Sequence, residues 1–110
     1  MDISIRDEGG VKVVSFDGEL DTSTSPDAEK YLNELRADGV QKILLNFEKL
    51  DFISSAGLRV LLATAQELKG SGGALRVCSL NKDVKEVFDI SGFSTLLSVH
   101  QNEARGLSGF

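Results

Sequence analysis

Residues 50–62 form the stretch around which this chain is organised: Leu50-Asp51-Phe52-Ile53-Ser54-Ser55-Ala56-Gly57-Leu58-Arg59-Val60-Leu61-Leu62. The apolar run that precedes it, Ile43 to Phe47, is typical of a buried strand. Apolar residues then recur at the spacing of one helix face, and these are Leu58, Leu61, Leu62, Ala65 and Leu68. The stretch therefore predicts a strand that leads into an amphipathic helix, roughly from Ala56 to Lys69.

Two serines, Ser54 and Ser55, stand where this helix begins. A hydroxyl there can accept a hydrogen bond from the free N–H groups of the first turn, so the residues alone favour a helix cap. The same position suits a phosphate, because free N–H groups and the positive end of the helix dipole attract anions. The small Ala56 and Gly57 leave space for such a group.

Composition narrows the class of protein. The 110 residues suffice for one domain that buries roughly two-thirds of its unfolded surface. The net charge of −5 argues against a nucleic-acid partner and fits a protein partner better. Cys78 is the only cysteine, which excludes an internal disulfide or zinc framework and favours a reducing compartment. No leader-like segment or long apolar run is present, so we expect a cytoplasmic protein that uses no membrane and no cofactor.

The first half of the chain predicts a hairpin and a helix. Ile3–Arg6 and Val11–Phe16 flank a turn-forming cluster, and the second run is apolar on both parities, as in a strand covered on both faces. Ser25 and Pro26 are typical of a helix start, with Ser25 as the cap. The buried stripe of this helix is Ala28, Tyr31, Leu32 and Leu35, and Gly39 ends it.

The second half adds two strands and a helix. Gly70-Ser71-Gly72-Gly73 closes a helix and enters the strand Ala74–Leu80, so it predicts a turn and not a phosphate loop. Cys78 falls in that strand, as a buried and inert thiol. Asn81 predicts the cap of a third helix, whose face is Val84, Val87 and Phe88. Phe93–Val99 predicts a last strand, and the glycine-containing tail from Glu103 a short or frayed helix.

This order of elements predicts an α/β protein. Residues 1–110 would form a single domain with a mixed four- to five-stranded sheet and three to four helices packed against it. An enzyme is not expected. The lone histidine, His100, has no catalytic partner near it in the sequence, and neither a nucleophile elbow nor a metal-ligand spacing occurs.

Two segments resemble the bacterial anti-sigma factor antagonists of the STAS-domain family: Phe52–Leu62 and Gly18-Glu19-Leu20-Asp21. The resemblance covers nearly the whole chain and implies that Ser55, two places before Gly57, is phosphorylated by an anti-sigma factor kinase. Ser55 would then be both a helix cap and a switch. The classical pattern has Asp where this chain has Ser54, so Ser54 is the second candidate acceptor.

The resemblance also implies a partner-binding surface. Asp21 alone is best explained as a carboxylate that caps a loop, but in the family this loop lies near the phosphorylated serine. The partner-binding residues that it implies are Asp21, Thr22, Ser54, Ser55, Ala56, Gly57 and Arg59.

The resemblance leads to one function and one alternative. The unphosphorylated form would bind an anti-sigma factor serine kinase and release a sigma factor, phosphorylation would abolish binding, and a serine phosphatase would reset the protein. The free domain would be a monomer. The alternative is a STAS subunit of a stable assembly, such as a lipid-transport ATPase or stress-signalling complex, without sigma-factor switching.

Overall fold

The computed structural model describes all 110 residues. Its strands are β1 (Asp2–Glu8), β2 (Val11–Leu20), β3 (Lys42–Asn46), β4 (Leu50–Ile53), β5 (Ala74–Cys78) and β6 (Ser98–His100). Its helices are α1 (Ser25–Ala37), α2 (Ser55–Gly70), α3 (Lys82–Ile90), α4 (Phe93–Leu96) and α5 (Glu103–Leu107). The predicted α/β class is confirmed, with more short elements than the sequence indicated.

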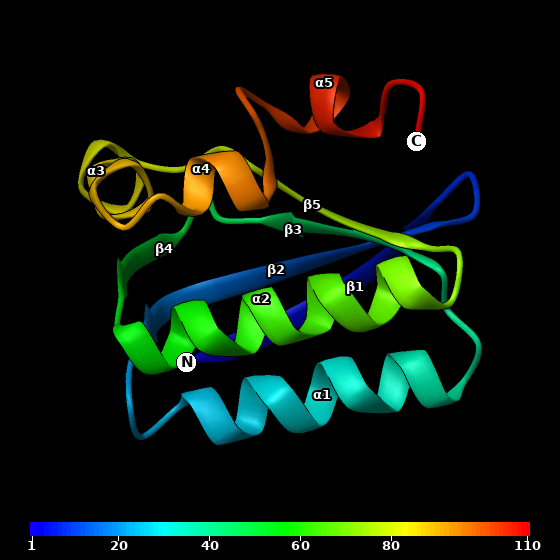
Figure 1. Cartoon of the computed structure of the whole chain (residues 1–110), viewed down its shortest axis with the longest axis horizontal. Helices are drawn as coiled ribbons and strands as arrows, with labels where there is room; N and C mark the ends of the chain where they lie inside the picture. The colour runs from blue at the N-terminus through cyan, green and yellow to red at the C-terminus, as the bar shows by residue number, and fades with distance from the viewer.

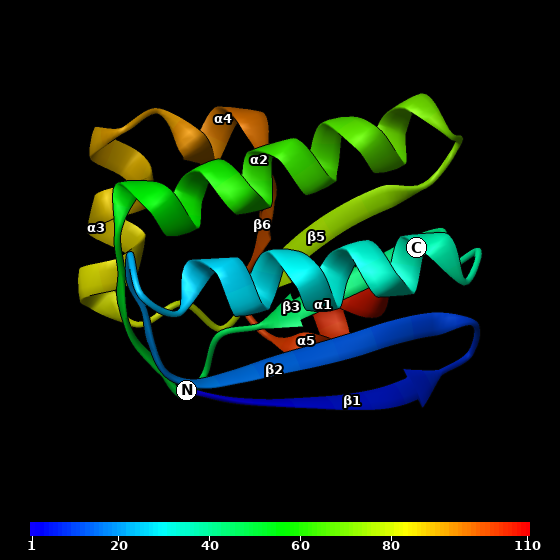
Figure 2. The same cartoon turned by 90° about the horizontal axis from the view of Figure 1, so that it is seen from below.

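The strands form one mixed sheet in the order β1-β2-β3-β5-β6. The hairpin β1–β2 is antiparallel, and the pairs β2–β3, β3–β5 and β5–β6 are parallel. The short strand β4 runs parallel to the last residues of β2, beyond the end of β3. Consequently α1 and α2 are crossover helices, and both lie on the same face of the sheet (Figures 1 and 2).

Helices cover both faces of the sheet. In Figure 1, α1 and α2 lie below the strands, α5 lies above them, and α3 and α4 sit at the end where β4 is. The larger core lies under α1 and α2 and includes Phe16 and Phe47, whose rings stack with centroids 5.8 Å apart. A smaller core on the opposite face contains Val13 and Leu44, with Leu107 packed against it.

Strand β2 belongs to both cores, as its double apolar pattern predicted. Val14 and Phe16 face the larger core, whereas Val11 and Val13 face the smaller one, and all four are buried. The other confirmed predictions are the Gly39 turn after α1, the turn at Gly70–Gly73, the buried Cys78 and the short α5. Asn81 caps α3 by accepting from the Val84 N–H at 2.8 Å.

Strand β4 was not predicted. Its burial runs buried, exposed, exposed, buried, because the register with β2 shifts between Gly18 and Glu19, so the alternation that identifies a strand is missing. Pairing with β4 also extends β2 as far as Leu20. The sequence predicted that this strand ends at Phe16 and that Gly18–Leu20 follow it. The Asn81 side chain donates to the Leu50 carbonyl at 2.8 Å and ties β4 to α3.

Two other boundaries differ from the prediction. Phe93–Leu96 is a helical turn and not the start of a strand, because Gly92 (φ 79°) turns the chain and the Phe93 ring packs edge-on against Phe88. Ser25 is the first residue of α1 and not its cap. Thr24 precedes the helix without a capping hydrogen bond from its side chain.

Helix α2 has the predicted phase with one correction. Leu58, Leu61 and Leu68 are buried and Arg59 is exposed, but Leu62 is only half-buried. Val60 and Thr64 share the buried face. The buried stripe therefore includes the side of Val60 and Thr64 more than that of Leu62. Helix α2 packs against α1, which lies beside it (Figure 2).

We expect Leu61→Ala to lower the free energy of unfolding by about 2–5 kcal/mol, because it opens a cavity under α2. Leu62→Ala should cost only about 1–2 kcal/mol, since that side chain is half-buried. Arg59→Ala should stay within about 0.5 kcal/mol. Urea denaturation of the three variants tests this order, and an Arg59→Ala cost equal to that of Leu61→Ala would refute the helix phase.

Candidate functional site

The start of α2 separates the two serines by role. Ser54 is the N-cap, with extended backbone angles (φ −92°, ψ 172°), and its Oγ accepts from the Gly57 N–H at 3.2 Å. The Ser54 N–H in turn donates to the Leu20 carbonyl at 2.9 Å. The side chain of Ser54 therefore caps α2, and its backbone N–H attaches the start of α2 to the end of β2.

Ser55 is the first residue of α2. The sequence predicted that it caps the helix, but Ser54 has that role. The Ser55 side chain is exposed, and its hydroxyl makes no hydrogen bond within the chain. Helix geometry leaves the N–H groups of Ser55 and Ala56 without intrahelical acceptors. A free hydroxyl thus stands beside free amide donors and the positive end of the helix dipole, where a dianion is favoured.

Gly57 fixes how closely α2 approaches the sheet. A Cβ atom at this position would lie 2.9 Å from Leu20 Cγ and 3.0 Å from both Ile53 Cγ1 and the Leu20 carbonyl oxygen. No side chain fits there without moving the helix. Gly57 is buried, so its role in the structure is packing.

The loop after β2 is held by Asp21. Its Oδ1 accepts from the Ser23 and Thr24 N–H groups at 2.9 and 3.0 Å and from the Ser23 hydroxyl at 2.8 Å. Thr24 Oγ1 accepts from the Asp21 N–H at 2.9 Å, which completes a reciprocal pair like a capping box. The Ser23 hydroxyl, followed by the Thr24 amide, lowers the pKa of the Asp21 carboxyl below its ordinary value. The loop-capping role that the sequence suggested for Asp21 is confirmed.

A groove of about 350 Å³ runs between the first turns of α1 and α2. On the α1 side it is lined by Thr22, Ser25, Pro26 and Glu29, and on the α2 side by Ala56, Arg59, Val60 and Ala63. Figure 2 shows the two helices side by side, starting at the same end of the molecule. Ala56 follows Ser55 directly, so the groove begins next to the free hydroxyl.

The structure brings most of the predicted site residues to this end of the molecule. Thr22, Ala56 and Arg59 line the groove, Ser54 and Ser55 begin α2, and Asp21 holds the adjacent loop. Two features were missed. Glu29 also lines the groove, and Phe52 on β4 is 47% exposed although it lies three residues before Ser55. Neither could be found from the sequence, because both depend on how β4 and α1 are placed.

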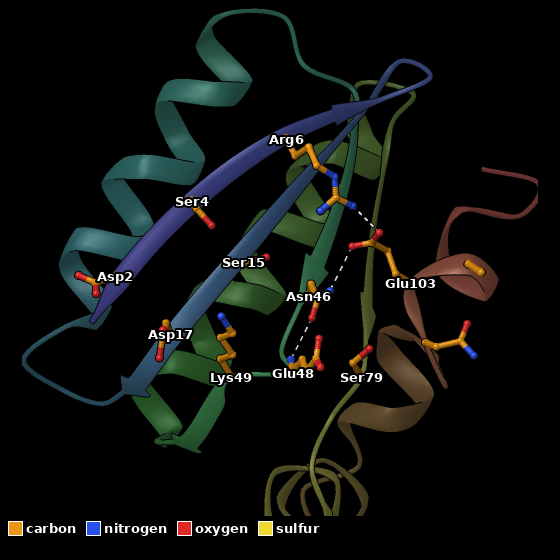
Figure 3. Close-up of a pocket in the computed structure, with 12 residues that line it drawn as sticks. Asp2, Ser4, Arg6, Ser15, Asp17, Asn46, Glu48, Lys49, Ser79 and Glu103 are labelled. Atoms are coloured by element: carbon orange, nitrogen blue, oxygen red, sulfur yellow. Dashed lines mark hydrogen bonds and ion pairs between the residues drawn. The ribbon is translucent and has the colours of Figure 1, made fainter.

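A larger hollow, of about 800 Å³, lies on the opposite face of the sheet (Figure 3). Eleven of its twelve lining residues are polar, and they include Asp17, Asn46, Glu48 and Glu103. Arg6 pairs with the Glu103 carboxylate, which also accepts from Asn46 Nδ2 at 3.1 Å. These contacts connect β1, β3 and α5, so the network holds the C-terminal helix over the sheet. None of the predicted site residues lines it.

The remaining reactive side chains lie elsewhere. Cys78 is fully buried, and desolvation raises the pKa of its thiol, which disfavours the thiolate. His100 Nε2 lies 2.8 Å from Ser98 Oγ, and partial burial lowers its pKa. The structure brings together no group of three His, Cys, Asp or Glu side chains able to hold a metal ion. None of its helices is both long enough and apolar enough to cross a membrane.

Comparisons with known proteins identify the family. The STAS domain model matches residues 2–106, so the chain belongs to the STAS domain family. The chain is 33% identical over 101 residues, 92% of its length and 87% of the relative's, to BtrV of Bordetella bronchiseptica, provisionally named an anti-sigma factor antagonist. It is 29% identical to the anti-sigma F factor antagonist of Paenibacillus polymyxa, over 98% of this chain and 93% of that protein.

Solved structures share the fold. An anti-sigma factor antagonist from Mycobacterium paratuberculosis superposes with a TM-score of 0.90 at 24% identity, covering 97% of this chain and 91% of that one. SpoIIAA, an anti-sigma factor antagonist, superposes in its unphosphorylated form with a TM-score of 0.73 at 20% identity, over 94% of this chain and 91% of that one. The phosphorylated form of Bacillus SpoIIAA gives 0.72 at 22% identity, over 94% and 95%.

We expect Asp21 to contribute to stability at neutral pH and to lose this contribution in acid. Its folded-state pKa lies below the ordinary 3.8, so the ionised form stabilises the fold above that pH and the effect disappears as the pH falls through the lowered value. Asp21→Asn keeps an acceptor oxygen but does not titrate. The melting temperature of the wild type should exceed that of Asp21→Asn at neutral pH, and the gap should close below pH 3.8. A gap independent of pH would contradict the role of the charge.

Proposed function

We propose that this chain is an anti-sigma factor antagonist whose unphosphorylated form binds an anti-sigma factor kinase and whose phosphorylation on Ser55 ends that binding. The observation that carries the proposal is the exposed, unbonded Ser55 hydroxyl at the first position of α2. Its relatives of similar length are named as antagonists of anti-sigma factors, which supports a regulatory and non-enzymatic role. A serine phosphatase would complete the cycle.

The choice of Ser55 over Ser54 follows from their contacts. Ser54 is half-buried and its Oγ already accepts from the Gly57 amide, a cap whose loss costs about 1 kcal/mol. Modification of Ser54 would also place a dianion in the tight junction with Leu20. Ser55 has neither restriction, because its hydroxyl is exposed and contributes nothing to the fold.

The surface around Ser55 is suited to a protein partner. The groove beside it offers Thr22, Ala56 and Arg59, and the exposed Phe52 ring lies on the preceding strand. Aromatic and arginine side chains carry much of the binding energy in protein interfaces. We propose that the partner contacts both the groove and Phe52, with Ser55 between them in sequence.

Phosphorylation would act on binding and not on folding. A phosphate brings about −1.5 to −2 charges, and at a helix N-terminus such charge favours the fold by about 0.3–1 kcal/mol. A change from nanomolar to micromolar affinity requires about 4 kcal/mol. Steric exclusion and desolvation of a dianion in a tight interface can supply that amount.

Phosphate mapping tests the acceptor. After incubation with the cognate anti-sigma kinase and ATP, mass spectrometry should find the phosphate on Ser55, and Ser55→Ala should abolish incorporation while Ser54→Ala retains it. Phosphate on Ser54 alone would transfer the switch to the neighbouring residue. If a kinase known to be cognate modifies neither serine, or if the chain co-purifies with a transporter or scaffold, the alternative of a stable STAS assembly is favoured.

Modification of Ser55 should abolish binding and leave the stability of the domain nearly unchanged. Phosphorylated protein and Ser55→Asp should lose about a thousandfold in affinity for the anti-sigma factor, whereas Ser55→Ala should bind persistently in the presence of ATP. Calorimetric melting temperatures of modified and unmodified protein should agree within a few degrees. A melting temperature lowered by many degrees, or amide NMR shifts that spread across the sheet, would mean that the switch is conformational.

A further inference from the structure

We propose that Arg59 is the internal partner of phosphorylated Ser55, and that phosphorylation therefore also withdraws a cation from the partner-binding groove. This inference rests on the proposed function, since it concerns the regulation of the same serine. Ser55 is the first residue of α2 and Arg59 follows four residues later, both exposed. Residues at this spacing are neighbours on one helix face, with Cβ atoms roughly 5–6 Å apart.

Arg59 has no partner in the unmodified protein. The structure records neither an ion pair nor a hydrogen bond for its guanidinium, although Glu29 lines the same groove. Three of the other four arginines are engaged: Arg6 and Arg36 pair with glutamates, and Arg76 bonds to backbone carbonyls and lies over the Phe110 ring. Only the Arg105 guanidinium, on α5, is free in the same way. Arg59 is also the only cation among the residues that line the groove.

The chemistry of the pair is favourable. A guanidinium presents a planar fork of donors that matches phosphate oxygens, and charge-assisted bonds of this kind are stronger than neutral ones. An anion placed four residues before a cation has the better order along a helix, since it also meets the positive end of the dipole. The phosphate would therefore be held by Arg59 on one side and by the free amides of the first turn on the other.

The neighbouring charges oppose the phosphate, which makes the cation more important. The elements next to the start of α2 carry carboxylates at Glu19, Asp21, Asp27, Glu29 and Asp51, against the cations Lys30 on α1 and Lys49 just before β4. Acidic groups therefore outnumber basic ones around this helix start. Without Arg59, these carboxylates would disfavour the dianionic phosphate. With Arg59 in place, the phosphate can ionise fully, and the groove is left without its positive charge.

The test uses full-length protein with phosphoserine encoded genetically at position 55, so that it needs no kinase. Titration of the phosphorus NMR signal gives the second pKa of the phosphate, ordinarily about 6. Arg59→Ala should raise that pKa by about 0.5 pH unit relative to the wild type, and Arg59→Lys should raise it less. The matched control is Lys69→Ala, which removes one charge from the same helix 14 residues, or roughly 21 Å, from Ser55 and should leave the pKa unchanged.

The inference is overturned if Arg59→Ala and wild type titrate alike, or if Lys69→Ala shifts the pKa as much as Arg59→Ala. Circular dichroism of each variant verifies that the domain is folded. This result is independent of the mapping experiment. If the pKa is unchanged in Arg59→Ala while a cognate kinase phosphorylates Ser55, Arg59 has no role and the proposed function stands. If the pKa shifts but a cognate kinase does not phosphorylate Ser55, Arg59 does pair with a phosphate at this position and the proposed function fails.

Discussion

The contact between the first turn of α2 and the end of β2 determines the architecture of the site. The Leu20 carbonyl accepts from the Ser54 N–H, and Gly57 lets the helix backbone approach the Leu20 side chain to a distance that excludes a Cβ atom. Strand β4 pairs with the same residues of β2, so the strand that enters α2 and the helix itself are both fixed on Leu20. The position of Ser55 in space follows directly from this junction.

A second constraint acts from the other side of the same junction. Leu20 is followed by Asp21, whose carboxylate and backbone N–H form reciprocal bonds with Thr24 and so fix the loop that leads into α1. Helices α1 and α2 therefore begin next to each other because both are attached to the end of β2. The groove between them is a consequence of that attachment, and it explains why two segments distant in the sequence, residues 22–29 and 56–63, contribute to one surface.

The sequence predicted those parts of the fold that depend on local pattern. The double apolar pattern of β2 and most of the buried stripe of α2 were apparent from side-chain spacing, and the cap at Asn81 was apparent from its residue type. The motif around Ser55 predicted the start of α2, while the role of Ser55 as an acceptor stays a prediction. The missed features depend on tertiary contacts. Strand β4 has a shifted register, Ser54 and Ser55 are equivalent as caps until the path of β4 is known, and the exposure of Phe52 depends on that same path.

Under the proposed function, the separation of capping from modification would let one helix start support both the fold and a switch. If the modified hydroxyl also capped the helix, a phosphate would have to break the cap bond, and part of its effect would be spent on stability. Here Ser54 caps, Gly57 packs and Ser55 projects outward, so three neighbouring residues have three separate roles. In the proposed switch, this rigid scaffold would make an added charge effective, because an interface cannot relax around a dianion that a firmly anchored helix holds in place.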